Sequence, residues 1–231
     1  IDSSSEVQCW GQNAQGQSNA PSGSYAKVDA GQHHSCAMDS AGEITCWGSN
    51  SFNQVSDTPT GPWIDFDSGS YHTCAIDSVG AVTCWGWNAY GQTNAPTGNF
   101  TQVSGGDRHS CGVLEDGTAL CWGDNTHPKS TPPAESFVMV GVKSNHSCGL
   151  TTSGTITCWG DDSYGLVSSA PTSNTFETLD VSANGNMHCA IDAVGSISCW
   201  GDDTHGVITN VPSAGPYNSV VVGAKFACAE D

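Results

Sequence analysis

The sequence has very little positive charge. Lysine and arginine together number 5 of 231 residues, Arg108 is the only arginine, and aspartate and glutamate number 23. Nucleic acids and anionic membrane surfaces bind clusters of lysine and arginine, so this composition argues against both as partners. The acidity is typical of a protein that must stay soluble, or of a surface that attracts a basic partner or cations, and we favour solubility.

The sequence also lacks the patterns of membrane segments and of common active sites. No apolar stretch approaches the roughly 20 residues with which a helix crosses a bilayer, so we expect no membrane insertion. No glycine-rich phosphate loop leads into a helix, and no calcium loop of the EF-hand type is present. Histidine and serine recur from repeat to repeat instead of forming the one set that Ser-His-Asp catalysis needs. We therefore expect no enzyme, no cofactor and no metal site.

Cysteine, by contrast, is abundant and regularly spaced, as in CAMDSAGEITCWGSN (36–50). If Cys36 and Cys46 face each other across two antiparallel strands, they enclose a three-residue loop whose last residue, Gly42, takes a left-handed conformation. Zinc sites usually use cysteines two to four residues apart, so we favour disulfides over metal ligation. The predicted bonds are Cys36–Cys46, Cys74–Cys84, Cys111–Cys121, Cys148–Cys158 and Cys189–Cys199, with turn glycines at Gly42, Gly80, Gly117, Gly154 and Gly195.

The tripeptide Cys-Trp-Gly begins at residues 9, 46, 84, 121, 158 and 199, which divides the chain into units of about forty residues. Short strands at such a period predict a propeller or a solenoid. The segments AKFACAED (224–231) and SEVQCWG (5–11) resemble the two halves of one hairpin, and together they complete a sixth unit. We therefore predict one all-β domain over residues 1–231, a six-bladed β-propeller whose ring is closed by terminal segments that share a blade and by a Cys9–Cys228 disulfide.

The stretches VDAGQHHSCAMDSAGEITCWGSNSFNQ (28–54) and GSYHTCAIDSVGAVTCWGWNAYGQTNAP (69–96) resemble repeats of the RCC1 (regulator of chromosome condensation) family. The resemblance is specific in the first three units, whereas the later ones replace the Asn-x-x-Gly-Gln loop by GDNTHPK, GDDSYGL and GDDTHGV. Family members commonly have seven blades, and this chain has room for six. The resemblance implies a propeller that binds partners through its loop faces, and an acidic, cysteine-paired member resembles secreted bacterial relatives more than the nuclear exchange factor.

Three recurring positions invite a structural explanation. The tryptophans after each second cysteine are expected to pack between neighbouring sheets. The histidines two residues before the first cysteine are expected to be buried and hydrogen-bonded, with a metal ring as the alternative. The Asn or Asp after Cys-Trp-Gly is expected to accept backbone N–H groups of its loop. The histidines are His34, His72, His109 and His146, and the tryptophans are Trp10, Trp47, Trp85, Trp122, Trp159 and Trp200.

Aromatic residues in the loops after Cys-Trp-Gly are the candidate contact residues. The loop positions should lie on one face of the ring, and aromatic side chains with few lysines around them match the composition of interface cores. Trp87 and Trp63 break the repeat, and Trp87 is the stronger candidate because it occurs in one unit; a packing role stays open for the loop tyrosines. The set is Trp87, Trp63, Phe52, Tyr90 and Tyr164.

The function that these features favour is a non-enzymatic binding or structural module that binds protein through its loop faces. A lectin with one sugar site per repeat is the alternative, and a cation-dependent enzyme or sensor that uses the axial channel is a weaker one. Equivalent pockets in every repeat would favour the lectin, whereas one irregular patch around Trp87 would favour a protein partner. Twelve cysteines indicate an oxidising compartment, so we expect a secreted protein whose leader has been removed before IDSSSE.

Overall fold

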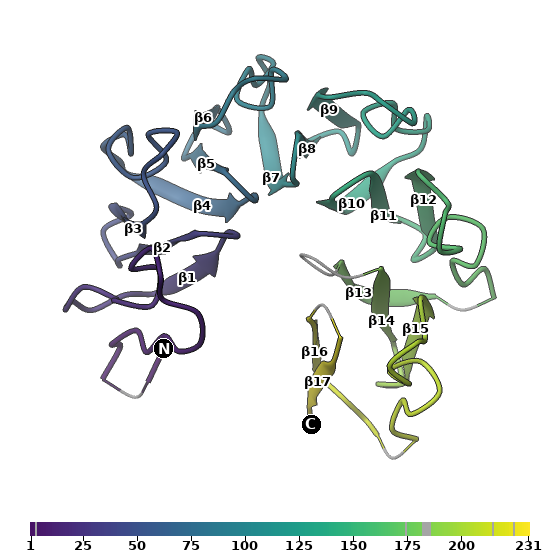
Figure 1. Cartoon of the computed structure of the whole chain (residues 1–231). Coiled ribbons are helices and arrows are strands. Elements are labelled where there is room, and N and C mark those ends of the chain that lie inside the picture. Colours follow the sequence, from purple (N-terminus) through teal and green to yellow (C-terminus); the bar gives the residue numbers. More distant parts are fainter. Residues whose placement is uncertain (3, 174, 182–185, 214, 224) are drawn as a thin grey trace.

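The computed structural model describes residues 1–2, 4–173, 175–181, 186–213, 215–223 and 225–231, and every regular element in these ranges is a strand. The strands form six antiparallel sheets, which we number as blades 1 to 6 and which follow one another around a common centre (Figure 1). The all-β propeller fold predicted from the repeats is thereby confirmed.

Blades 1 to 5 each contain three sequential strands, of which the first lies nearest the centre (Figure 1). Blades 1 to 3 are β1 (Lys27–Ala30), β2 (His34–Met38) and β3 (Ile44–Gly48); β4 (Trp63–Ser68), β5 (His72–Asp77) and β6 (Val82–Gly86); and β7 (Phe100–Gly105), β8 (His109–Leu114) and β9 (Ala119–Gly123). Blades 4 and 5 are β10 (Phe137–Lys143), β11 (His146–Thr151) and β12 (Ile156–Gly160); and β13 (Phe176–Val181), β14 (Met187–Asp192) and β15 (Ile197–Gly201). Blade 6 contains β16 (Ser219–Val222) and β17 (Ala227–Glu230).

The hairpin between the second and third strands has the predicted register. Cys36 is the register partner of Cys46 in blade 1, and the corresponding pair is opposed in each of blades 2 to 5. All five predicted local disulfides are present. Gly42 has φ 83°, and its four counterparts have φ between 78° and 84°, which confirms the left-handed turn position.

Gly42 also serves the contact with the next blade. The backbone N–H of Trp63, which begins β4, donates to the Gly42 carbonyl over 2.9 Å. A Cβ atom on Gly42 would lie 2.5 Å from the Trp63 carbonyl oxygen, well inside van der Waals contact. The turn therefore needs glycine both for its backbone conformation and for the close approach of the following blade.

Each join between two neighbouring blades from blade 1 to blade 5 is an apolar cluster with a tryptophan in it, and Trp47 lies in a similar cluster that blade 1 forms with the segment around Val7. Between blades 1 and 2, for example, Ile44 and Cys46 pack against Phe66, Ala75 and Trp85. The indole N–H of each of these tryptophans donates to a backbone carbonyl in the loop that follows the preceding Cys-Trp-Gly. The acceptor is the eighth residue after the cysteine of that preceding tripeptide. The bonds are Trp47 to Gln17, Trp85 to Gln54, Trp122 to Gln92, Trp159 to Lys129 and Trp200 to Leu166. The packing role predicted for the repeated tryptophans is confirmed for these five.

The repeated histidines form a second set of contacts across the joins. The Nε2 atom of His34 lies 2.9 Å from the Thr73 hydroxyl of the next blade, and His72 is paired in the same way with Ser110 at 2.8 Å. Burial lowers the pKa of His34 to about 4 and that of His72 to about 3, so both rings are neutral at neutral pH. The buried, hydrogen-bonded role predicted for the repeated histidines is confirmed for His34, His72 and His109, whereas His146 is buried but its Nε2 has no hydrogen-bond partner among the described residues.

The predicted closure of the ring is not seen. In the described part of the chain β17 pairs with β16 alone, and residues 6–11 form no strand. Cys9 and Cys228, predicted to be disulfide-bonded, are both free, because Cys9 packs beside Val7 and Val28 of the blade 1 cluster while Cys228 lies on the exposed strand β17. The segment with Cys9 and blade 6 lie on the two sides of an opening in the ring (Figure 1).

Candidate functional site

The loops after the third strands and the connectors between the first and second strands lie at the same end of the blades. The reason is the antiparallel register, which places the end of the third strand beside the start of the second: Gly86 is the partner of His72. We call this end the loop face. The opposite end carries the hairpin turns that contain Gly42 and its counterparts.

Four aromatic side chains gather on the loop face of blades 1 and 2. The ring centroids of Phe52 and Trp87 are 5.5 Å apart, and Tyr71 lies 5.7 Å from Phe52 and 5.6 Å from Trp87. Tyr90 extends the cluster with a centroid 5.3 Å from that of Trp87. We call Phe52, Tyr71, Trp87 and Tyr90 the aromatic patch. Phe52 is 41% exposed and Tyr90 43% exposed, so the rings support one another while part of their surface faces solvent.

Loop hydrogen bonds hold the patch in place. The backbone N–H of Phe52 donates to Oε1 of the fully buried Gln54, and the N–H of Tyr90 donates to Gln92 in the same way. The N–H of Trp87 donates to the Tyr71 carbonyl over 2.9 Å, which ties the loop to the neighbouring connector. A patch on such braced loops binds with little loss of conformational entropy.

The Asn or Asp that follows each Cys-Trp-Gly braces the same loops. Asn50 accepts the N–H groups of Val55 and Ser56, and Asp162 accepts those of Val167 and Ser168. The predicted role as a backbone acceptor is confirmed, although the donors lie five and six residues further along the chain. These side chains therefore shape the loop face and are already occupied by their own loops.

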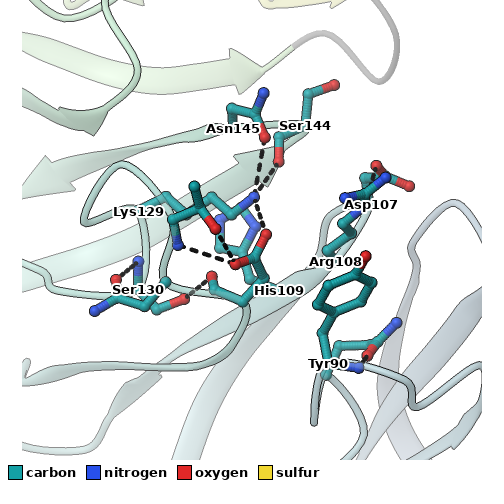
Figure 2. Close-up of polar contacts among 12 residues, drawn as sticks. Tyr90, Asp107, Arg108, His109, Lys129, Ser130, Ser144 and Asn145 are labelled. Atoms are coloured by element: carbon teal, nitrogen blue, oxygen red, sulfur yellow. Dashed lines mark hydrogen bonds and ion pairs between the residues drawn. The ribbon is translucent and has the colours of Figure 1, made fainter.

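The aromatic patch borders a depression of about 470 Å³. The connectors of blades 1 to 4 also line it, through Gln32, Ser70, Asp107 and Ser144. Arg108 stands at its rim, with its guanidinium carbon 4.9 Å from the centre of the Tyr90 ring and its Nε 3.5 Å from a carboxylate oxygen of Asp107 (Figure 2). The site thus has one aromatic wall, polar walls and one exposed cation.

A buried ion pair fixes the connector of blade 4. Lys129 is fully buried, and its Nζ lies 3.0 Å from Asp124, 3.0 Å from the Asn145 side-chain oxygen and 3.3 Å from the Ser144 carbonyl (Figure 2). Burial raises the pKa of Asp124, but hydrogen bonds from Thr126 and Lys129 outweigh it and hold that pKa well below its usual range. Lys129 occupies the repeat position of Gln54 and Gln92. The buried ion pair was not predicted, although this replacement of glutamine by lysine is visible in the sequence.

The structure brings together three of the five predicted contact residues and leaves two apart. Phe52, Trp87 and Tyr90 belong to the aromatic patch, whereas Trp63 pairs with Asp77 at the hairpin-turn end of blade 2. Tyr164 is 51% exposed, but no ring contact within the described ranges includes it. Tyr71 belongs to the patch and was not predicted, because its contacts run between a connector and a loop that are distant along the repeat.

The described ranges offer no group of three or more His, Cys, Asp or Glu residues placed to hold a metal ion. The histidines whose pKa is lowered by burial, such as His34 and His72, are buried between blades. Within those same ranges, no helix has the length and apolar character of a membrane span. What the loop face offers is a preformed apolar surface beside a polar depression, which is suited to binding.

The model of the regulator of chromosome condensation (RCC1) repeat matches residues 25–54, 63–92, 100–127 and 138–166, more than half of the chain. The chain belongs to the RCC1-repeat family. The resemblance inferred from the quoted repeats is thereby confirmed. The matched segments cover blades 1 to 4 and so extend into two of the three loops, GDNTHPK and GDDSYGL, in which the sequence departs from the repeat. None of the curated proteins compared with the sequence matches it.

Several solved propellers are similar to this chain. The ectodomain of the Physcomitrella patens receptor kinase CR4 is 26% identical with a TM-score of 0.74, over 87% of this chain and 59% of that one. The CRINKLY WD40 ectodomain of the Arabidopsis thaliana receptor kinase ACR4 is 27% identical with a TM-score of 0.68, over 86% and 73%. Prp20p of Saccharomyces cerevisiae is 14% identical with a TM-score of 0.72, over 89% and 69%, a likeness of fold alone. The chain thus spans less than two thirds of the CR4 ectodomain.

Proposed function

We propose that this protein is a non-enzymatic binding module that recognises a partner protein through the aromatic patch. The observation that carries the proposal is that the patch is unique to one part of the ring. The positions that correspond to Trp87 in blades 1, 3, 4 and 5 are Ser49, Asp124, Asp161 and Asp202. A set of identical sugar sites, one per repeat, is not expected from such different side chains, so a protein partner is favoured over a lectin.

The chemistry of the patch fits the centre of a protein interface. Such centres are enriched in tyrosine, tryptophan, phenylalanine and arginine and depleted in lysine. Phe52, Trp87 and Tyr90 provide the aromatic part, and Arg108 provides a cation on the exposed rim. The loop face otherwise carries carboxylates such as Asp107 and Asp161, and the net charge of the chain is −18. We therefore infer a partner whose surface combines an apolar centre with basic residues around it.

The comparisons support a binding role in general terms. Two of the similar structures are receptor-kinase ectodomains, and the structure of yeast RCC1 (Prp20) was solved with Kap60 bound. The study of Prp20p concerns its binding to Gsp1p and histones, which are properties of that protein. Together with the five disulfides, the ectodomain relatives support a secreted or extracellular location, which we propose for this chain as well.

We also infer that residues 1–231 form one propeller domain.

A capture experiment with matched variants tests the proposal. The wild-type protein, the double variant Phe52→Ser/Trp87→Ser and the control variant Tyr164→Ser are immobilised and exposed to proteins of the producing organism. Tyr164 is the control because it occupies the repeat position of Phe52 and Tyr90, is exposed and lies outside the patch. We expect the same partner to be captured by the wild type and the control and lost from the double variant.

The strength and stoichiometry of binding decide between the alternatives. Aromatic anchors at the centre of an interface are typically worth 2 kcal/mol or more, so the double variant should bind at least about 30-fold more weakly. One partner is expected per chain. Equal binding by all three proteins would contradict the proposal, and binding of several glycan molecules per chain without loss in the double variant would replace it by the lectin.

A further inference from the structure

Trp10 differs from the other tryptophans at its place in the repeat. It is 87% exposed, whereas Trp47, Trp85, Trp122, Trp159 and Trp200 are 4–8% exposed. Each of these five belongs to the apolar cluster of one join and donates its indole N–H to a loop carbonyl. Trp10 has the same sequence context, Cys-Trp-Gly, but makes none of these contacts.

The join between blades 5 and 6 lacks a tryptophan. Its cluster contains Met187, Cys189 and Val222, with Ile197, Cys199, Val207, Val220 and Ala227 packed against it. The clusters of the four other joins each contain one buried tryptophan, and Trp47 lies in the cluster that blade 1 forms with Val7 and Cys9. There is thus one tryptophan without a join and one join without a tryptophan.

A cavity of about 290 Å³ borders the join between blades 5 and 6. Its walls include Ile197, Cys199, Val220 and Ala227 of the join and Val207. Val207 is the eighth residue after Cys199, which is the position whose carbonyl accepts the indole N–H in every other join. The cavity therefore has both the apolar lining and the place for the acceptor that the repeat provides for tryptophan.

The other half of the contact is already formed. Val7 and Cys9 pack against Ala37 and Trp47 of blade 1, as Ile44 and Cys46 pack against Ala75 and Trp85 of blade 2. The segment around Cys9 therefore lies against blade 1 as the third strand of a preceding blade would. On the far side of the opening, β17 has an unpaired edge within the described ranges, and Cys228 is exposed on it.

We propose that residues 8–11 form the third strand of blade 6 and insert Trp10 into this cavity. In blade 1, Cys36 faces Cys46 and Ser35 faces Trp47. The same register pairs Cys228 with Cys9 and Ala227 with Trp10, and the Trp10 indole N–H then donates to the Val207 carbonyl. A Cys9–Cys228 disulfide then locks the ring in this closed arrangement.

The lock forms by thiol–disulfide exchange with an oxidised small-molecule disulfide. Cys228 is exposed and is reached first: its thiolate attacks the small disulfide and releases one equivalent of thiol. The Cys9 thiolate then attacks the Cys228 sulfur of the mixed disulfide and releases the second equivalent. The protein loses two protons and two electrons, and the small disulfide takes them up as two thiols.

Oxidation followed by peptide mapping tests the proposal on the full chain. The protein is incubated with oxidised glutathione, alkylated without reduction and digested. We expect a peptide that links Cys9 to Cys228, in a species with the mass of one chain. Two alkylated thiols in the folded, oxidised protein would overturn the proposal. A Cys9–Cys228 link found only in a two-chain species would also overturn it, because a second copy would then supply the strand.

Substitution of Trp10 gives an independent readout. In the oxidised protein, Trp10→Ala should lower the melting temperature about as much as Trp85→Ala does. The neighbouring exposed residue provides the control, since Gln8→Ala should leave the melting temperature within about a degree of wild type. If Trp10→Ala is as silent as Gln8→Ala in the oxidised protein, the indole does not enter the cavity and the proposal fails.

Discussion

Trp85 and Trp87 are two residues apart, yet the structure assigns them opposite roles. The Trp85 side chain is 5% exposed in the join between blades 1 and 2, and its indole N–H donates to the Gln54 carbonyl over 3.1 Å. A buried tryptophan removes about 150–250 Å² from water, and at about 25 cal/mol per Å² this is worth about 4–6 kcal/mol. Residual compactness of the unfolded chain reduces the figure by roughly 10–40%.

Truncation at Trp85 also leaves a buried carbonyl without its donor, which costs about 1 kcal/mol more. Trp85→Ala should therefore lower the free energy of unfolding by about 4–5 kcal/mol, or the melting temperature by about 10–15 °C for a chain of this size. Trp87→Ala loses three ring contacts that are partly exposed to solvent, so we expect a cost of about 1–2 kcal/mol. This cost is larger than that expected for the same substitution at a loop tryptophan without ring contacts.

Chemical denaturation of the two variants under non-reducing conditions measures the difference, with the disulfides kept intact so that the unfolded states match. Two results would refute the reasoning. If Trp85→Ala costs no more than Trp87→Ala, the join does not depend on the indole. If Trp87→Ala is the more damaging change, the patch is part of the core and not a binding surface.

Two further predictions concern the joins. Because burial lowers the pKa of His72 to about 3, the unfolded chain binds more protons than the folded one between that pH and about 6.5, and stability falls as the pH falls through this range. Between pH 7.5 and 4.5, the free energy of unfolding should therefore fall by about 2–3 kcal/mol less in His72→Gln than in the wild type. An equal fall in both proteins would contradict this prediction. Gly42→Ala and Gly91→Ala introduce a side chain at nearly equal φ, 83° and 84°, but the new Cβ lies 2.5 Å from backbone at Gly42 and 3.4 Å from a flexible side chain at Gly91. Both substitutions should lower the free energy of unfolding by about 1–2 kcal/mol through backbone strain, and Gly42→Ala by about 1–3 kcal/mol more through the clash with the next blade. Equal denaturation midpoints for the two variants would show that the neighbouring blade moves aside at Gly42 without cost.

Features that depend on local spacing were predictable from the sequence. The ten-residue interval between cysteines fixes which residues face each other in a hairpin, and that interval implies a glycine at the third loop position. Cys36 with Cys46, and Gly42 between them, followed directly from this reasoning. The packing of the repeated tryptophans followed as well, because a large side chain at one fixed place in every sheet has to fill the space between sheets.

Features that depend on how blades meet were not predictable. Tyr71 joins the aromatic patch from a connector, and only the antiparallel register brings it beside Trp87. Trp63 was selected because it breaks the repeat, but it begins β4 at the opposite end of the blade. The exposure of Trp10 also lay beyond the repeat pattern, since its sequence context is the same as that of its five buried counterparts.

Site-specific photo-crosslinking tests the central claim most directly. A photoreactive phenylalanine analogue is placed at Tyr90 in the patch, at Tyr164 on the same face and at Trp63 on the opposite end. Each protein is irradiated with the proteins of the producing organism, and adducts are identified by mass spectrometry. We predict a single protein adduct from position 90 and none of that adduct from positions 164 and 63. The same adduct from all three positions, or adducts from 164 or 63 but not from 90, would contradict the claim that the aromatic patch binds the partner.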